Sequence, residues 1–166
     1  MLIPACARPR ARHALLVARL VALLAVPLAA ACQPSPPDPA LFDWVECADC
    51  QRDAYARVVA LGTPAVPVLS DWLLNGPPID RIANVRATTE RLVTGQPIAE
   101  ATKAAIVRKQ VADYTRQYQR RAALALGGIG GSEALVALCR ARTAAPTTLE
   151  RAVLDTAVAR TGGHCP

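Results

Sequence analysis

Glycine recurs along this chain at a nearly constant interval. Gly62, Gly95 and Gly127 follow one another at intervals of 33 and 32 residues, and ALGGIGG (125–131) aligns with AVARTGG (157–163) at a shift of 32. Glycine destabilises a helix interior and often ends a helix, so each interval can hold one pair of helices. A period in this range predicts a helical solenoid, in which stacked units bury one another's apolar faces.

The apolar residues past residue 43 fall at helical rather than alternating spacing. We therefore predict an all-α domain over residues 44–166, a short α solenoid of about three and a half helical-hairpin units. The expected helices are 47–61 with 64–75, 79–93 with 97–113, 114–126 with 132–142, and a single final helix, 147–160. Because that last helix has no partner in its own unit, we expect Val153, Leu154 and Val158 to be partly uncovered.

The segment QRRAALALGGIGGSEALVALCRA (119–141) resembles a HEAT repeat of the short kind found in the phycobilisome lyase family. In this resemblance Arg121 opens the first helix, residues 127–131 form the turn, and Ser132 caps the second helix. VVALGTPAVPVL (58–69) repeats the scheme with a shorter turn. The resemblance implies a scaffold that binds protein, because HEAT repeats mostly serve that role. The lyases' bilin attachment activity conflicts with the export predicted from the N-terminus.

Residues 1–31 have the features of a bacterial signal peptide. Basic side chains precede an apolar run, 20–31, that is too short to span a bilayer and ends in three alanines before Cys32. Small residues followed by cysteine resemble the lipobox of bacterial lipoproteins, which implies a Cys32 thiol acylated by a lipid such as palmitate. Cleavage after Ala31 to a soluble product is the alternative.

A proline-rich stretch follows Cys32. Four prolines between residues 33 and 39 oppose a helix and favour an extended spacer, so we predict a tether over residues 32–43. Gln33 directly after the cysteine resembles outer-membrane sorting. These features predict an exported cell-envelope lipoprotein, anchored in the outer membrane and facing the periplasm.

The net charge of +6 does not indicate nucleic-acid binding. Four of the 19 basic residues lie in the leader, and from residue 33 onward 15 basic residues stand against 13 acidic ones. Such a balance gives little drive for binding a phosphate backbone. His164 is the sole histidine past the leader, which removes most histidine-based acid–base and serine-nucleophile schemes. We predict no catalytic residue and no cofactor.

Four cysteines follow Cys32, at positions 47, 50, 139 and 165. An even number in an exported chain indicates disulfides, with three possible pairings. On the repeat register Cys139 and Cys165 belong to neighbouring units, and Cys47 and Cys50 to the first unit. We therefore predict a Cys47–Cys50 bond and a Cys139–Cys165 bond that fastens the final helix to the unit before it.

Two other uses of these cysteines stay open. A C-x-x-C pair at a helix N-terminus can lower a thiol pKa, so Cys47 and Cys50 could serve a thiol-disulfide oxidoreductase, although such enzymes place the pair after a strand. Zinc would have to recruit Cys139, Cys165 and His164 from the opposite end of the solenoid. We therefore predict no metal.

Residues 103–121 carry six basic side chains against Asp113 alone. Helical spacing places Lys109, Arg116 and Arg120 beside Asp113 on one face, opposite a buried stripe. The stripe consists of Val107, Val111, Tyr114 and Tyr118. A solvated outer face is one interpretation of this pattern. The functional one is binding to an anionic partner: lipid headgroups, cell-wall polymer or an acidic protein surface.

Overall fold

A computed structural model describes residues 36–47, 52–145 and 148–166. Every regular element within these ranges is a helix, so the predicted all-α class is confirmed. The chain divides into two units, Met1–Pro36 and Pro37–Pro166, and all of the described helices belong to the second. The predicted signal peptide, Cys32 and Cys50 lie outside the described residues.

The helices follow one another with short connections. They are α1 (Pro39–Glu46), α2 (Arg52–Ala60), a 3-10 turn (Thr63–Ala65) leading into α3 (Val66–Asn75), α4 (Ile79–Val93), α5 (Glu100–Ile129), α6 (Gly131–Ala144) and α7 (Thr148–Arg160). None of the described helices alone is long and apolar enough to cross a membrane. Helix α2 and the segment Thr63–Asn75 are long and apolar enough only when taken together, and the chain bends by 96° between them.

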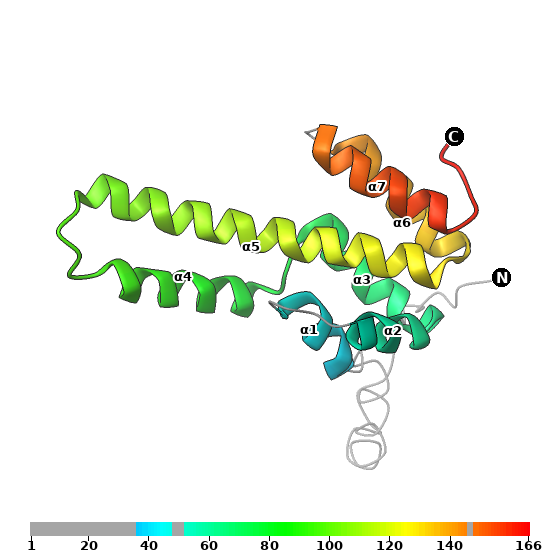
Figure 1. Cartoon of the computed structure of the whole chain (residues 1–166), viewed down its shortest axis with the longest axis horizontal. Coiled ribbons are helices and arrows are strands. Elements are labelled where there is room, and N and C mark those ends of the chain that lie inside the picture. Colours follow the sequence, from blue (N-terminus) through cyan, green and yellow to red (C-terminus); the bar gives the residue numbers. More distant parts are fainter. Residues whose placement is uncertain (1–35, 48–51, 146–147) are drawn as a thin grey trace, which may run out of the picture. The chain divides into compact units, whose positions relative to one another are not determined.

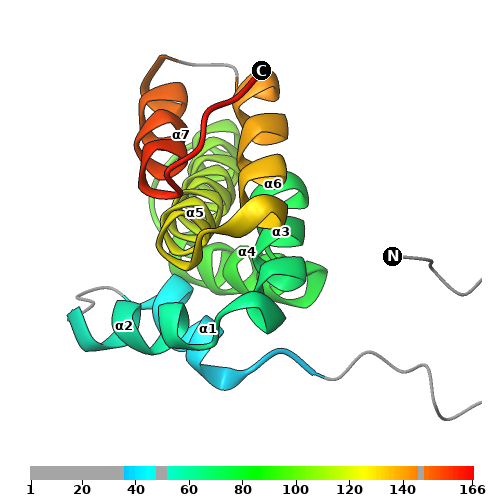
Figure 2. The ribbon, with the colours of Figure 1, turned by 90° about the vertical axis from the view of Figure 1, so that its right-hand side faces the viewer.

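Helix α5 contacts each of the other six helices that the structure describes. Figure 2 views it close to end-on, with α3, α6 and α7 around it. Its C-terminal part supplies much of the core through side chains that are fully buried, Tyr118, Ala122, Ala125 and Leu126. Figure 1 shows α4 and the N-terminal half of α5 extending beyond the other helices. We call this extension, residues 79–113, the arm.

The predicted break between residues 113 and 114 is wrong, because α5 runs through it without interruption for 30 residues. Residues 100–126 contain neither glycine nor proline and are rich in good helix formers, so nothing in the local sequence ends the helix. The second and third predicted hairpins therefore share one helix.

The turn between α5 and α6 is shorter than the predicted turn over residues 127–131. Gly127 and Gly128 are helical, and the turn lies at Gly130 and Gly131, which have φ of 71° and 85°. A Cβ at Gly127 would lie 2.8 Å from the carbonyl oxygen of Ala157. Glycine at this position thus lets the α7 backbone approach α5 closely.

The predicted tether, residues 32–43, includes the start of α1, which begins at Pro39. Proline is tolerated in a first helical turn, and the Asp38 side chain accepts a hydrogen bond from the Ala40 amide at 2.8 Å. Leu41, Trp44 and Val45 are buried and give the short helix a packed face. The first hairpin also begins later than predicted, because Cys47 caps the C-terminus of α1 and α2 starts at Arg52.

The final helix is better covered than predicted. Leu154 and Val158 are 6% and 7% exposed, because α7 packs against both α5 and α6, whereas Val153 is partly exposed as predicted. A disulfide joins Cys139 of α6 to Cys165, which follows α7 in the chain, and their Cα atoms are 5.4 Å apart. This is the pair that the repeat register predicted, and it ties the C-terminal tail to α6.

Candidate functional site

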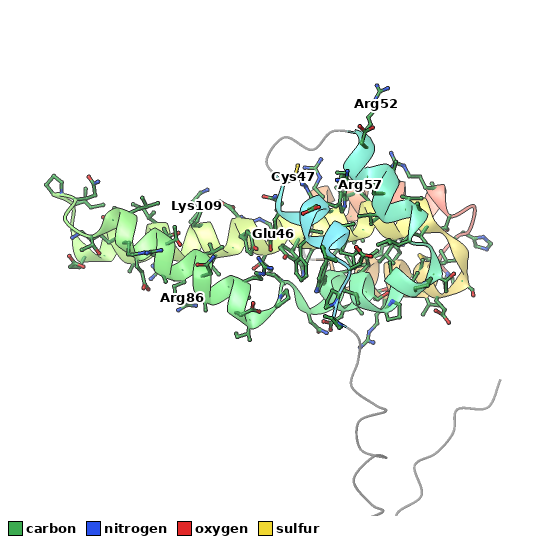
Figure 3. All side chains as sticks on the ribbon, turned by 90° about the horizontal axis from the view of Figure 1, so that it is seen from below. Glu46, Cys47, Arg52, Arg57, Arg86 and Lys109 are labelled. Atoms are coloured by element: carbon green, nitrogen blue, oxygen red, sulfur yellow. A yellow bond between two sulfur atoms is a disulfide. The ribbon has the colours of Figure 1, made fainter. Side chains whose placement is uncertain are left out.

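The Glu46 carboxylate binds three side chains from two helices at the base of the arm. Oε1 accepts hydrogen bonds from Tyr118 Oη at 2.6 Å and from Tyr114 Oη at 3.1 Å. Oε2 pairs with Arg81 Nη1 of α4 at 3.1 Å. Figure 3 shows Glu46 at the end of α1, where the arm meets the other helices. This cluster fixes α1 to both α4 and α5.

Side chains of α5 also bind the C-terminal carbonyl groups of α1. Gln117 Nε2 donates to the Val45 carbonyl at 3.2 Å, and Arg121 Nη1 donates to the Trp44 carbonyl at 2.5 Å. The last carbonyls of a helix lack partners within it and carry partial negative charge. The side chains of α5 therefore satisfy groups that α1 leaves open.

Burial changes the acidity of the groups around Glu46. Desolvation, with the hydrogen bond to Glu46, raises the pKa of Tyr118 far above its usual value, and desolvation raises the pKa of Tyr114 as well. Burial, and to a smaller extent the nearby positive charge of Arg120, lowers the pKa of Arg121. Both phenols are therefore protonated hydrogen-bond donors to Glu46 at neutral pH.

A groove of about 480 Å³ lies between α4 and α5 in the arm. We call it the arm groove. Its lining residues are all uncharged: Asn84, Val85, Thr88, Thr89, Leu92, Val93, Ile106 and Gln110. Two apolar side chains of the groove are open to solvent, Leu92 at 70% and Ile106 at 40% exposure. An uncharged groove with exposed apolar side chains can bind an apolar surface of another molecule.

The predicted basic face has the helix phase that the sequence indicated. Lys109, Arg116 and Arg120 are exposed, whereas Tyr118 of the predicted stripe is buried and Val107, Val111 and Tyr114 are partly buried. Asp113 accepts from Lys109 at 2.6 Å and also pairs with Arg116. The hydrogen bond from Lys109, outweighing desolvation, lowers the pKa of Asp113. Two of the three predicted binding residues thus share one carboxylate.

Cys47 lies outside the helix predicted over residues 47–61. Cys47 is disulfide-bonded and caps the C-terminus of α1, and Cys50 lies outside the described residues. The C-terminal end of α1, next to Cys47, carries partial negative charge, which does not stabilise a thiolate. In the part of the chain that the structure describes, no three histidine, cysteine or acidic side chains gather to hold a metal ion.

Glu46, Arg81 and the arm groove were not predicted from the sequence. Spacing along α4 and α5 does mark the groove, because Asn84, Thr88 and Leu92 recur every four residues, as do Ile106 and Gln110. The chain matches no family model, no curated protein and no solved structure.

Proposed function

We propose that this chain is an exported lipoprotein of the bacterial cell envelope, anchored through Cys32, whose HEAT-type helical domain binds a protein partner without catalysis. The observation that carries the proposal is the exposure of large apolar side chains on the arm. The described residues contain five such exposed side chains, and four belong to the arm: Ile79, Leu92, Ile98 and Ile106. Two of these four, Leu92 and Ile106, line the arm groove together. Single exposed apolar residues are ordinary, but apolar side chains exposed together on one surface are typical of a protein-binding site.

The arrangement around Gly130 supports the HEAT-type interpretation. There α5 passes into α6 through a tight turn, and both helices contact α7. The small side chains of Ala122, Ala125 and Ala134 are buried among these helices. They allow the helix axes to approach closely, as packed helical hairpins require.

Partner binding can be tested with the full-length tagged chain extracted from membranes in mild detergent. We expect a second protein to co-purify with the chain in constant ratio. When the tag is moved to that second protein, the chain should co-purify with it. Repeated purification of the chain alone, at physiological salt and after chemical cross-linking, would contradict the proposal.

The anchor has a separate test. Cys32→Ser should move the protein from the membrane fraction to a soluble or unprocessed form, because the acylated thiol is lost. Cys6→Ser, which changes a cysteine of the predicted leader, is the matched control and should leave the membrane fraction unchanged. Unaltered membrane association of Cys32→Ser with intact cleavage would rule out the lipid anchor.

A further inference from the structure

Helix α1 shows what kind of segment the surface beside the arm can hold. Its sequence, PALFDWVE, contains Asp43 and Glu46 but no basic residue. Leu41, Trp44 and Val45 are buried, so α1 is a short amphipathic helix with an acidic side. Arg81, which pairs with Glu46, supplies positive charge to that side.

The residues that hold α1 continue into the arm groove. On α5, Tyr114 and Gln117 hydrogen-bond to α1, and Gln110 and Ile106 precede Tyr114 by one and two turns. Residues three or four apart lie on the same side of a helix. The groove therefore extends the α5 surface on which α1 lies.

Helix α4 shows the same continuity. Arg81 pairs with α1, and Asn84, Thr88 and Leu92 follow it at spacings of three and four residues along the groove. From Arg81 to Leu92 the helix rises about 16 Å, or about three turns. Helix α1 contacts this surface at Arg81, through Glu46 and the Phe42 ring, and Leu92 lies exposed at the other end.

Basic side chains lie on both edges of the arm groove. Arg91 Nη2 donates to Thr88 Oγ1 at 3.2 Å, which places its guanidinium beside a lining residue of α4. On α5, Lys109 adjoins the lining residue Gln110 and shares Asp113 with Arg116. Lys109 and Arg86 point to opposite edges of the arm in Figure 3. Arg86 and Arg91 of α4 and Lys109 of α5, against the carboxylate of Asp113, leave these edges with net positive charge.

We propose that the arm groove binds an acidic amphipathic helix of a partner protein, continuing the line of α1. Its apolar residues contact Leu92 and Ile106, and its acidic residues lie near Arg91 and Lys109. Charge complementarity selects this occupant, because the lining is uncharged and both edges are positive. The inference rests on the proposed function, since it takes the partner to be a protein.

Two fluorescent peptides of about 18 residues test the inference. One has leucine at helical i, i+3, i+4 and i+7 positions and glutamate beside them, and the other has lysine in place of every glutamate. We expect the full-length chain to bind the acidic peptide at least about ten-fold more tightly at low salt, measured by fluorescence anisotropy. The preference should shrink at about 1 M salt, where charges are screened beyond about 3 Å.

Variants locate the binding. Leu92→Glu and Ile106→Glu should each weaken binding of the acidic peptide about ten-fold, through loss of apolar contact and added repulsion. Val136→Glu is the matched control, because Val136 is 68% exposed on α6, and it should bind as the parent does. Arg91→Glu with Lys109→Glu should abolish the preference for the acidic peptide. Circular dichroism melting establishes that each variant folds.

Several results would overturn the inference. They are equal binding of the two peptides, no binding of either, or a loss in Val136→Glu as large as in Leu92→Glu. Sedimentation showing self-association that Leu92→Glu abolishes would assign the groove to a second copy instead. If the protein that co-purifies with the parent chain also co-purifies with Leu92→Glu, the groove is not its binding site, and the proposed function stands.

Discussion

Tyr118 donates a hydrogen bond to Glu46, 72 residues earlier in the chain, with Oη 2.6 Å from Oε1. Tyr118 is fully buried in the middle of the domain, whereas Glu46 ends the first helix. The bond therefore joins α1 to the helix that contacts all the others, and Arg81 extends the connection to α4.

Glu46→Ala should lower the free energy of unfolding by about 1–3 kcal/mol, because it removes the acceptor of buried hydroxyl groups. Urea unfolding followed by circular dichroism measures the change. Asp43→Ala is the matched control: Asp43 is exposed on the same helix, and its loss should matter within about 0.5 kcal/mol. Equal effects of the two variants would mean that the Glu46 cluster does not hold α1.

Stability should fall as the pH rises above about 10, the pKa of an ordinary tyrosine. The folded state raises the pKa of Tyr114 and Tyr118, so these phenols stay neutral there while the unfolded chain ionises. Their contribution is fully present below pH 10 and is lost as the pH rises above it. Tyrosinate absorbance should therefore rise further when the protein is unfolded by urea at about pH 11. An unchanged absorbance would contradict the burial of these phenols.

Gly127→Ala should destabilise the domain by about 1–3 kcal/mol, although alanine favours a helix. The added Cβ would meet the backbone of Ala157, which cannot rotate away as a flexible side chain can. Ala104→Gly at an exposed position of α5 measures helix propensity alone and should cost about 1 kcal/mol. A Gly127→Ala protein more stable than the parent would mean that α7 does not approach α5 this closely.

Loss of the Cys139–Cys165 bond should lower stability by about 3 kcal/mol, since the bond closes a loop of 26 residues. Hydrogen exchange in Cys139→Ser/Cys165→Ser should rise mainly in residues 148–163, because the tail is then free of α6. Cys47→Ser/Cys50→Ser is the control and should leave exchange in that region unchanged. A peptide map linking Cys139 to a cysteine other than Cys165 would remove this connection.

Local patterns predicted much of the helix content and the phase of the basic face on α5, and the repeat register predicted the Cys139–Cys165 pair. The break at residue 113 was wrong because it came from the repeat period rather than from a local stop signal. Helix α1 was missed because prolines suggested a spacer, although Asp38 before Pro39 is a start signal.

The Glu46 cluster could not be predicted from spacing. Its partners lie 35 to 72 residues away, and their meeting depends on how α1 packs against α4 and α5. The arm groove likewise needs α4 and α5 side by side. Each helix alone shows a row of uncharged residues, which is equally compatible with a buried face.

Photo-crosslinking inside cells decides whether the arm carries the partner. A photoreactive phenylalanine analogue would replace Leu92, Ile106 or, as the control, Val136 in the full-length chain. If the arm groove binds an acidic helix, illumination gives one discrete adduct with another protein from positions 92 and 106 and none from position 136. No adduct from positions 92 and 106, or the same adduct from position 136, would contradict partner binding at the arm.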